Sequence, residues 1–353
     1  MRDFIAVSRV VRAKRWGKDL VRSGGFPVAS RLWNRIPDAL HHPRPHILGI
    51  ALTRICNADC TFCAYQFLDK SERFTMPEAL FEKICAQVKE MGIKRVQLAP
   101  NLGDPLVAPH FLDKVDALRA AGVEWFTLAT NGILLDKVGI DAFLARGPDE
   151  IGISTTAFDA AMYKRLYRSD QYERMRRNVL TLLRKNRALP PEKRRCIQMR
   201  LRIDWPLEEV MKLPDTAEIN ELADTVEWNT AYADWGGLIK KEHLTGTMAF
   251  EPQVPLENRP CKQLYDLAIH PDGEVLACAC RNVHHDPDMS LGTLSEMDLQ
   301  TAWARLERVT ENWRNGKVPK TCATCTMYND PARAWPGFAR TAAEELLHKA
   351  RAR

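Results

Sequence analysis

Residues 47–63 read ILGIALTRICNADCTFC, an apolar run followed at once by cysteines at positions 56, 60 and 63. The apolar run predicts a short strand that is buried on both faces. The cysteines then lie in a loop at the C-terminal end of a strand, where α/β sheets and barrels place their sites. Three closely spaced thiolates can hold three corners of a [4Fe–4S] cube and leave one iron open. A zinc site would normally bring four ligands.

Strand-like and helical patterns alternate from this loop to residue 230. The predicted strands are 47–53, 94–100, 124–130, 150–156, 196–203 and 225–230, and the predicted helices are 76–92, 110–122, 134–147, 171–187 and 206–222. This alternation predicts an α/β fold with a parallel sheet, either open or wound into a barrel. Six units are fewer than the eight of a full barrel.

The pattern changes after residue 235. Two strand-like runs within 263–279 flank Pro271-Asp272-Gly273, which predicts a β-hairpin, and a helix is predicted over 298–314. We therefore expect four segments. They are a basic N-terminal extension (1–45), a partial barrel (46–235), a small hairpin-plus-helix domain (236–335) and a C-terminal helix (336–353).

Charge is uneven along the chain. The net charge is +6, and residues 1–45 carry ten Lys/Arg against three Asp/Glu. A solvated helix is the favoured interpretation of this segment, and contact with an anionic membrane surface is the alternative. No nucleic-acid-binding motif accompanies it. Because no secretory signal is recognisable and the many cysteines suit metal binding better than disulfides, we expect a cytoplasmic protein.

The cysteine loop, the strand before it and Phe62 resemble the radical S-adenosylmethionine (radical SAM) enzymes. The resemblance implies a partial (β/α)6 TIM-type barrel, in agreement with the six units. It also implies a [4Fe–4S] cluster on Cys56, Cys60 and Cys63 whose open iron binds SAM. One electron, from a flavodoxin- or ferredoxin-type reductant, then cleaves SAM to a 5′-deoxyadenosyl radical that abstracts a substrate hydrogen atom.

The resemblance also assigns cofactor-binding residues. Gly103-Asp104-Pro105 resembles a family motif that holds the SAM amino group, with Asp104 in place of the usual Glu, although a plain turn is the alternative. Ser154 and Arg168 match contacts to the SAM ribose or carboxylate, and Thr130-Asn131-Gly132 matches a mostly structural turn. The full set is Phe62, Tyr65, Gly103, Asp104, Pro105, Asn131, Ser154 and Arg168.

A second set of cysteines follows the barrel. Cys261, Cys278, Cys322 and Cys325, with the hairpin between the first two, resemble the SPASM and twitch modules. The resemblance implies one auxiliary [4Fe–4S] cluster, because no cysteine follows Cys325. Four thiolates also suit a structural zinc ion, so zinc is the competing interpretation.

Three cysteines and two aspartates complete the predictions. Cys85 and Cys196 are expected to be structural. Cys280 is a candidate hydrogen donor, an alternative cluster ligand or a spare thiol. Asp204 and Asp234 follow the fifth and sixth predicted strands, so they are the candidate bases at the rim of the barrel.

We therefore expect a radical SAM oxidoreductase or epimerase. The expected substrate is a carbohydrate or another small polar molecule, which is epimerised or dehydrogenated. Only about 45 residues precede the first strand, less than a usual leader-binding domain, which favours a small molecule over a peptide. A peptide-modifying maturase is the alternative. An iron–sulfur electron carrier and a zinc-stapled binding protein are alternatives of another class.

Overall fold

The computed structural model describes residues 45, 47–99, 102–252, 255–256, 258–278 and 286–329. Residues 1–44 of the basic extension, Cys280 and the predicted final helix lie outside these residues. No helix in the described ranges is long and apolar enough to cross a membrane.

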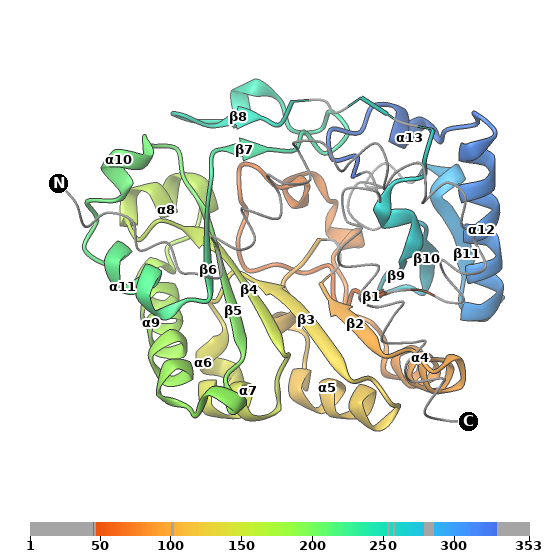
Figure 1. Cartoon of the computed structure of the whole chain (residues 1–353), viewed down its shortest axis with the longest axis horizontal. Helices are drawn as coiled ribbons and strands as arrows, with labels where there is room; N and C mark the ends of the chain where they lie inside the picture. The colour runs from red at the N-terminus through yellow and green to blue at the C-terminus, as the bar shows by residue number, and fades with distance from the viewer. Residues whose placement is uncertain are drawn as a thin grey trace, which may run out of the picture.

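Within these residues, nine strands form one sheet in the order β11-β10-β9-β1-β2-β3-β4-β5-β6 (Figure 1). From β1 to β6 the neighbours are parallel and follow chain order, which confirms the predicted partial barrel. Because β6 ends the sheet, the barrel stays open. The strands of the sheet are β1 (Leu48–Ile50), β2 (Arg95–Leu98), β3 (Trp125–Thr130), β4 (Glu150–Thr156), β5 (Cys196–Arg202), β6 (Thr225–Asn229), β9 (Leu267–Ile269), β10 (Glu274–Leu276) and β11 (Ser290–Thr293), while β7 (Ala231–Tyr232) and β8 (Ala249–Phe250) pair separately.

Helices cover the outer side of the sheet, and Figure 1 shows α5, α6, α7 and α9 below β2 to β5. The helices are α4 (Glu78–Met91), α5 (Phe111–Ala120), α6 (Leu135–Val138), α7 (Ile140–Arg146), α8 (Ala160–Tyr167), α9 (Tyr172–Ala188), α10 (Leu207–Val210), α11 (Thr216–Leu222), α12 (Leu299–Arg314) and α13 (Lys320–Ala323). The helix predicted over 134–147 is divided at Gly139, whose φ of +87° interrupts helical geometry. The helix predicted over 206–222 is also divided, and α8 was not predicted.

Side chains along β5 show which face of the sheet lines the barrel. Ile197, Met199 and Leu201 are fully buried and belong to the same core as the α9 side chains. Since alternate residues of a strand point to opposite faces, Gln198, Arg200 and Arg202 lie on the inner face, where they are half-buried. The interior of a closed TIM barrel is filled by branched apolar side chains. This inner face is polar instead.

The hairpin predicted around Pro271-Asp272-Gly273 is formed by β9 and β10. Strand β9 pairs in parallel with β1, so this region extends the barrel sheet. Asp266 holds the junction, because its Oδ1 accepts a hydrogen bond of 3.0 Å from the backbone N–H of Ile47. Burial raises the pKa of Asp266 to about 7.

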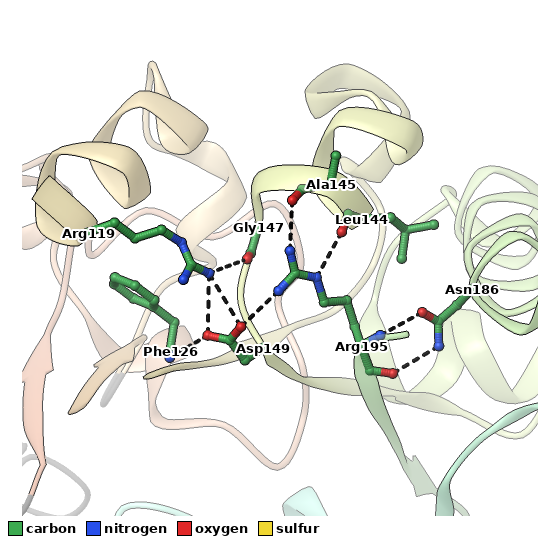
Figure 2. Close-up of polar contacts among 8 residues, drawn as sticks. All are labelled: Arg119, Phe126, Leu144, Ala145, Gly147, Asp149, Asn186 and Arg195. Atoms are coloured by element: carbon green, nitrogen blue, oxygen red, sulfur yellow. Dashed lines mark hydrogen bonds and ion pairs between the residues drawn. The ribbon is translucent and has the colours of Figure 1, made fainter. Parts of the chain in front are cut away.

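A polar network fixes the N-terminal ends of three strands (Figure 2). Asp149, just before β4, accepts hydrogen bonds from Arg195 Nη1 at 2.8 Å, Arg119 Nη2 at 3.3 Å and the N–H of Phe126 at 2.9 Å. Arg195 also donates to the carbonyls of Leu144 and Ala145 at 2.8 Å. The network lies at the end of the strands opposite the cysteine loop, so we assign it to stability.

Candidate active site

A close backbone contact positions the cysteine loop. The N–H of Asp104 donates to the carbonyl of Ile55 at 2.9 Å, and Gly103 makes this approach possible. Gly103 has a φ of +100°, and a Cβ atom there would lie 2.4 Å from the carbonyl oxygen of Thr53. Only glycine therefore allows the 102–106 loop to pack against the chain directly before Cys56.

Asp104 makes structural hydrogen bonds that were not predicted, and its predicted contact with the SAM amino group stays a prediction. Its carboxylate is 3% exposed and accepts hydrogen bonds from the N–H of Leu106 at 3.0 Å, Thr130 Oγ1 at 2.8 Å and the N–H of Asn131 at 2.8 Å. Burial raises its pKa. Pro105, at the first position of the 3₁₀ helix Pro105–Val107, is buried beside it. These bonds make Asp104 a positioning residue that joins the loops after β2 and β3, which sequence analysis did not reveal.

Asn131 and Tyr65 hold the first cysteine. Asn131 Nδ2 donates to Asn57 Oδ1 at 2.6 Å and lies 3.8 Å from Cys56 Sγ. The hydroxyl of Tyr65 donates to the carbonyl of Cys56 at 3.2 Å. The turn after β3 thus contacts the cysteine loop directly, and its role goes beyond turn formation.

Helix α8 supports the middle of the loop. The N–H groups of Asp59 and Thr61 donate to the carbonyls of Tyr167 and Leu166 at 3.2 and 2.9 Å. Arg168 follows this helix end and donates to Gln66 Oε1 at 3.1 Å, with its side chain 43% exposed. Arg168 therefore lies on the outer side of the loop, and its predicted contact with SAM stays a prediction.

Ser154 and Phe62 lie deeper in the site. The hydroxyls of Ser154 and Tyr167 are 3.4 Å apart. The ring of Phe62 packs edge-on against Tyr167 at 5.5 Å and beside Tyr232 at 5.3 Å, measured between ring centroids. Phe62 is thus fixed between α8 and β7.

The three thiols of the loop lie close enough to affect one another's protonation. Burial raises the pKa of both Cys56 and Cys60, and the other cysteines of the loop raise it further by their charge. Buried polar atoms without a protein partner, Asn57 Nδ2 and Thr61 Oγ1, lie on the same loop. Three half-buried thiols with unsatisfied polar groups beside them fit a three-cysteine cluster that binds a polar ligand.

Arg202 is a site residue that sequence analysis missed. It ends β5 on the inner face, with its guanidinium carbon 5.6 Å from the ring centroid of Phe62 and 5.5 Å from that of Tyr232. Its positive charge acts against the upward pKa shift of Cys60. Its Nε and the hydroxyl of its cross-strand neighbour Thr156 are buried and have no hydrogen-bond partner in the part of the chain that the structure describes. The alternation of apolar and polar residues in the β5 sequence CIQMRLR was the signal that could have placed Arg202 on the inner face.

Asp204 is buried in an ion pair at the rim of the barrel, and its role as a base stays a prediction. It is 2% exposed, and both of its oxygens accept from Arg165, Oδ2 from Nε at 2.6 Å and Oδ1 from Nη2 at 2.8 Å. Thr245 Oγ1 donates to the same carboxylate at 2.8 Å. Burial alone would raise the pKa of Asp204, but these hydrogen bonds lower it below its ordinary value. Asp204 is an anchor between β5 and α8, and the half-buried Asp234 also remains a candidate base.

Three cysteines of the second set come together. Burial, with the charges of Cys261 and Cys325, raises the pKa of Cys322 to about 12. Cys261 Sγ accepts from the N–H of Asn329 at 3.4 Å, and Cys325 Sγ accepts from the N–H of Met327 at 3.3 Å. Backbone N–H groups of this kind tune iron–sulfur clusters. Cys278 is half-buried two residues after β10, and its ligand role stays a prediction.

Within the described ranges, no three His, Cys, Asp or Glu side chains are placed like the ligands of one metal ion. Cysteines of a [4Fe–4S] cluster bind different irons, so their sulfurs do not converge on one point. Cys85 lies half-buried on α4, where burial raises its pKa to about 11, and Cys196 begins β5 at the end away from the loop. Both positions are consistent with structural roles.

Comparisons with known proteins agree with this geometry. A model of the radical SAM superfamily matches residues 50–188, and a model of the SPASM iron–sulfur cluster-binding domain matches residues 261–326. A probable GTP 3′,8-cyclase of Methanothermobacter marburgensis is 24% identical over 276 residues, which cover 69% of this chain and 87% of that protein. A probable GTP 3′,8-cyclase of Pyrococcus horikoshii is 32% identical over 117 residues, 33% of this chain and 36% of that protein.

Two solved structures show the same fold. BtrN in complex with AdoMet and 2-DOIA has a TM-score of 0.54 at 13% identity, covering 80% of this chain and 94% of that chain. Streptococcus suis SuiB bound to precursor peptide SuiA has a TM-score of 0.55 at 17% identity, covering 80% of this chain and 70% of that chain. The matched domains imply SAM and [4Fe–4S] clusters as cofactors. The chain therefore contains a radical SAM domain over residues 50–188, followed by a SPASM-type iron–sulfur cluster-binding domain over residues 261–326.

Proposed function

We propose that this radical SAM enzyme takes a hydrogen atom from a small polar substrate that carries an anionic group. The observation that carries the proposal is Arg202, a half-buried cation packed against the adjoining rings of Phe62 and Tyr232 beside the cysteine loop, whose buried Nε has no hydrogen-bond partner among the described residues. A buried polar group without a partner is costly, so its retention favours a ligand that completes its bonding. A carboxylate or phosphate has the matching charge and geometry.

The inner face of the sheet supports a polar substrate. Arg200 Nη2 donates to Gln198 Oε1 at 3.1 Å, and Gln198 Nε2 donates in turn to Glu150. The guanidinium of Arg200 lies over Gly152, since a Cβ atom on this glycine would be 3.4 Å from Arg200 Cζ. Hydrogen-bonding groups thus continue along β4 and β5 toward Arg202 at the cysteine loop.

Each group has a defined part in the proposed reaction. Cys56, Cys60 and Cys63 would hold the SAM-binding cluster, which together with SAM supplies hydrogen-atom abstraction. Cys261, Cys278, Cys322 and Cys325 would hold the auxiliary cluster. Arg202 and Arg200 would bind and orient the substrate. A flavodoxin- or ferredoxin-type protein would deliver the electron.

Two substrate classes fit the proposed anionic group, nucleotides and acidic sugars. The names of the sequence relatives support a nucleotide, so GTP is the first probe, and the polar inner face equally suits a phosphorylated or acidic sugar. Epimerisation would use Cys280 as hydrogen donor, whereas dehydrogenation would use Asp234 as base. Incorporation of solvent deuterium into the product, lost in Cys280→Ser, supports epimerisation, and a product without deuterium contradicts it.

The test starts with anaerobically reconstituted enzyme. We expect about eight irons per chain and formation of 5′-deoxyadenosine with SAM and dithionite. The Cys56→Ala, Cys60→Ala, Cys63→Ala variant should lose this product and retain the auxiliary cluster spectrum. A variant that still makes 5′-deoxyadenosine would refute the assignment of the cysteines. About four irons together with zinc would refute the auxiliary cluster.

Substrate charge is tested by the acceleration of SAM cleavage. GTP or an acidic sugar should accelerate it more than guanosine or a neutral sugar. Arg202→Gln should weaken the apparent affinity for the anionic compound about tenfold or more, the usual cost of losing a charged hydrogen bond, and Arg202→Lys should restore part of it. Equal affinity for charged and neutral compounds would contradict the proposal, and a response only to peptides would favour the peptide-modifying alternative.

A further inference from the structure

A tight turn lies between the two cysteine sets. This bridging turn, residues 234–237, follows β7 and has the sequence Asp234-Trp235-Gly236-Gly237. The carbonyl of Asp234 accepts from the N–H of Gly237 at 3.2 Å and of Ile239 at 2.9 Å. Asp234 Oδ1 also accepts from the N–H of Gly236 at 3.1 Å. The turn is therefore closed by its own hydrogen bonds and has a defined shape.

Trp235 connects the bridging turn to the first cysteine set. Its indole Nε1 donates to the carbonyl of Phe62 at 3.0 Å, directly before Cys63. The indole also packs in a small apolar cluster with Cys63, Tyr65 and Leu102. The backbone φ of Trp235 is +53°, which is rare for a bulky residue. Such a conformation persists only where the surroundings hold it, and it is frequent at functional sites.

Asp234 connects the same turn to the second set. Thr326 Oγ1 donates to Asp234 Oδ1 at 3.5 Å, and Thr326 directly follows Cys325. A continuous path of neighbouring residues thus runs from Cys63 through Phe62, Trp235, Asp234 and Thr326 to Cys325. Packed side chains and hydrogen bonds of this kind can carry energetic coupling between two sites.

We propose that Trp235 is a positioning residue that couples the two cluster sites. A cluster on Cys322 and Cys325 would fix the adjacent Thr326 and, through the bridging turn, the Phe62 carbonyl and the loop that presents the SAM-binding cluster. SAM affinity then depends on the occupancy of the auxiliary site. The inference rests on the cofactors of the two domains and not on the proposed substrate.

A double-mutant cycle on SAM affinity tests the coupling. Equilibrium dissociation constants are measured anaerobically for reconstituted wild type, Trp235→Phe, the Cys322→Ser, Cys325→Ser variant, and the combination of all three changes. In the wild-type background, the cysteine changes should weaken SAM binding about fivefold or more, the usual lower range of coupling between sites. In the Trp235→Phe background they should weaken it less than about twofold. The same factor in both backgrounds would overturn the proposal.

Two further variants keep the test decisive if the cysteine variants fold poorly. Thr326→Val retains every cysteine but removes the hydroxyl that contacts Asp234, so it should weaken SAM binding. Its effect on SAM affinity should not add to that of Trp235→Phe. Additive effects would contradict a shared path. Trp228→Phe is the matched control, because Trp228 is half-buried on β6 and does not belong to the small apolar cluster that Trp235 forms with Cys63. The factor caused by the cysteine changes should persist in this control background.

Discussion

Replacement of Gly103 by alanine tests whether the cysteine loop depends on a close backbone approach. Two costs add. A φ of +100° is unfavourable for an L-residue with a side chain, at about 1–2 kcal/mol. The new Cβ would also lie 2.4 Å from the Thr53 carbonyl oxygen, which belongs to the backbone and can move only with the chain. A forced backbone shift of this kind costs about 1–3 kcal/mol. We therefore expect a total loss of about 2–5 kcal/mol of unfolding free energy.

Gly122→Ala is the matched control. Gly122 has nearly the same φ, +101°, but a Cβ atom there meets no atom within 4 Å. It should cost only the conformational part, about 1–2 kcal/mol. Urea denaturation of the iron-free, reduced proteins measures both losses. Iron content after reconstitution should fall for Gly103→Ala and not for Gly122→Ala. Equal losses in the two variants, with full iron loading in both, would refute the argument.

Three further predictions concern the buried carboxylate of Asp104 and the half-buried carboxylates of Asp149 and Asp266. Asp104→Asn should destabilise even the iron-free, SAM-free protein by about 1–3 kcal/mol. The reason is that the new amide would place its donors against the N–H of Asn131 and the hydroxyl of Thr130. An unchanged free energy of unfolding would mean that Asp104 acts only through SAM. Asp149→Asn should cost about 2–3 kcal/mol, since Arg119 and Arg195 would lose their shared carboxylate, with SAM affinity unchanged in the reconstituted protein. Burial raises the pKa of Asp266 to about 7, so the folded protein retains a proton that the unfolded chain releases near pH 4. Its contribution to the unfolding free energy should therefore fall as pH rises from 4 to 7. Asp266→Asn should remove that part of the slope and be the more stable protein at pH 8, and identical pH profiles would contradict this assignment.

Features encoded by neighbouring residues were predictable from the sequence. The three-cysteine loop after the first strand, the six parallel strands with helices in the five connections between them, and the hairpin around Pro271-Asp272-Gly273 were all predicted and agree with the structure. Each depends on spacing or periodicity over a short segment, which the chain displays directly. The division of the predicted 134–147 helix at Gly139 was not predicted from local signals, because a single glycine does not always end a helix.

Contacts between distant residues were decided by the tertiary structure. Asp204 is paired with Arg165, 39 positions away, so that it anchors β5 to α8. Asp266 lies 219 positions from Ile47, yet it holds the junction that extends the barrel sheet into the hairpin. The sequence shows that a carboxylate or an arginine is present, but the packing of the folded chain decides whether that side chain is paired, buried or left for a ligand. The cysteine spacing in the sequence therefore indicated the radical SAM domain that the family model matches. Folding decided that Arg202 lies unpaired at Nε beside the loop, because only the packed chain brings β5, Phe62 and Tyr232 together.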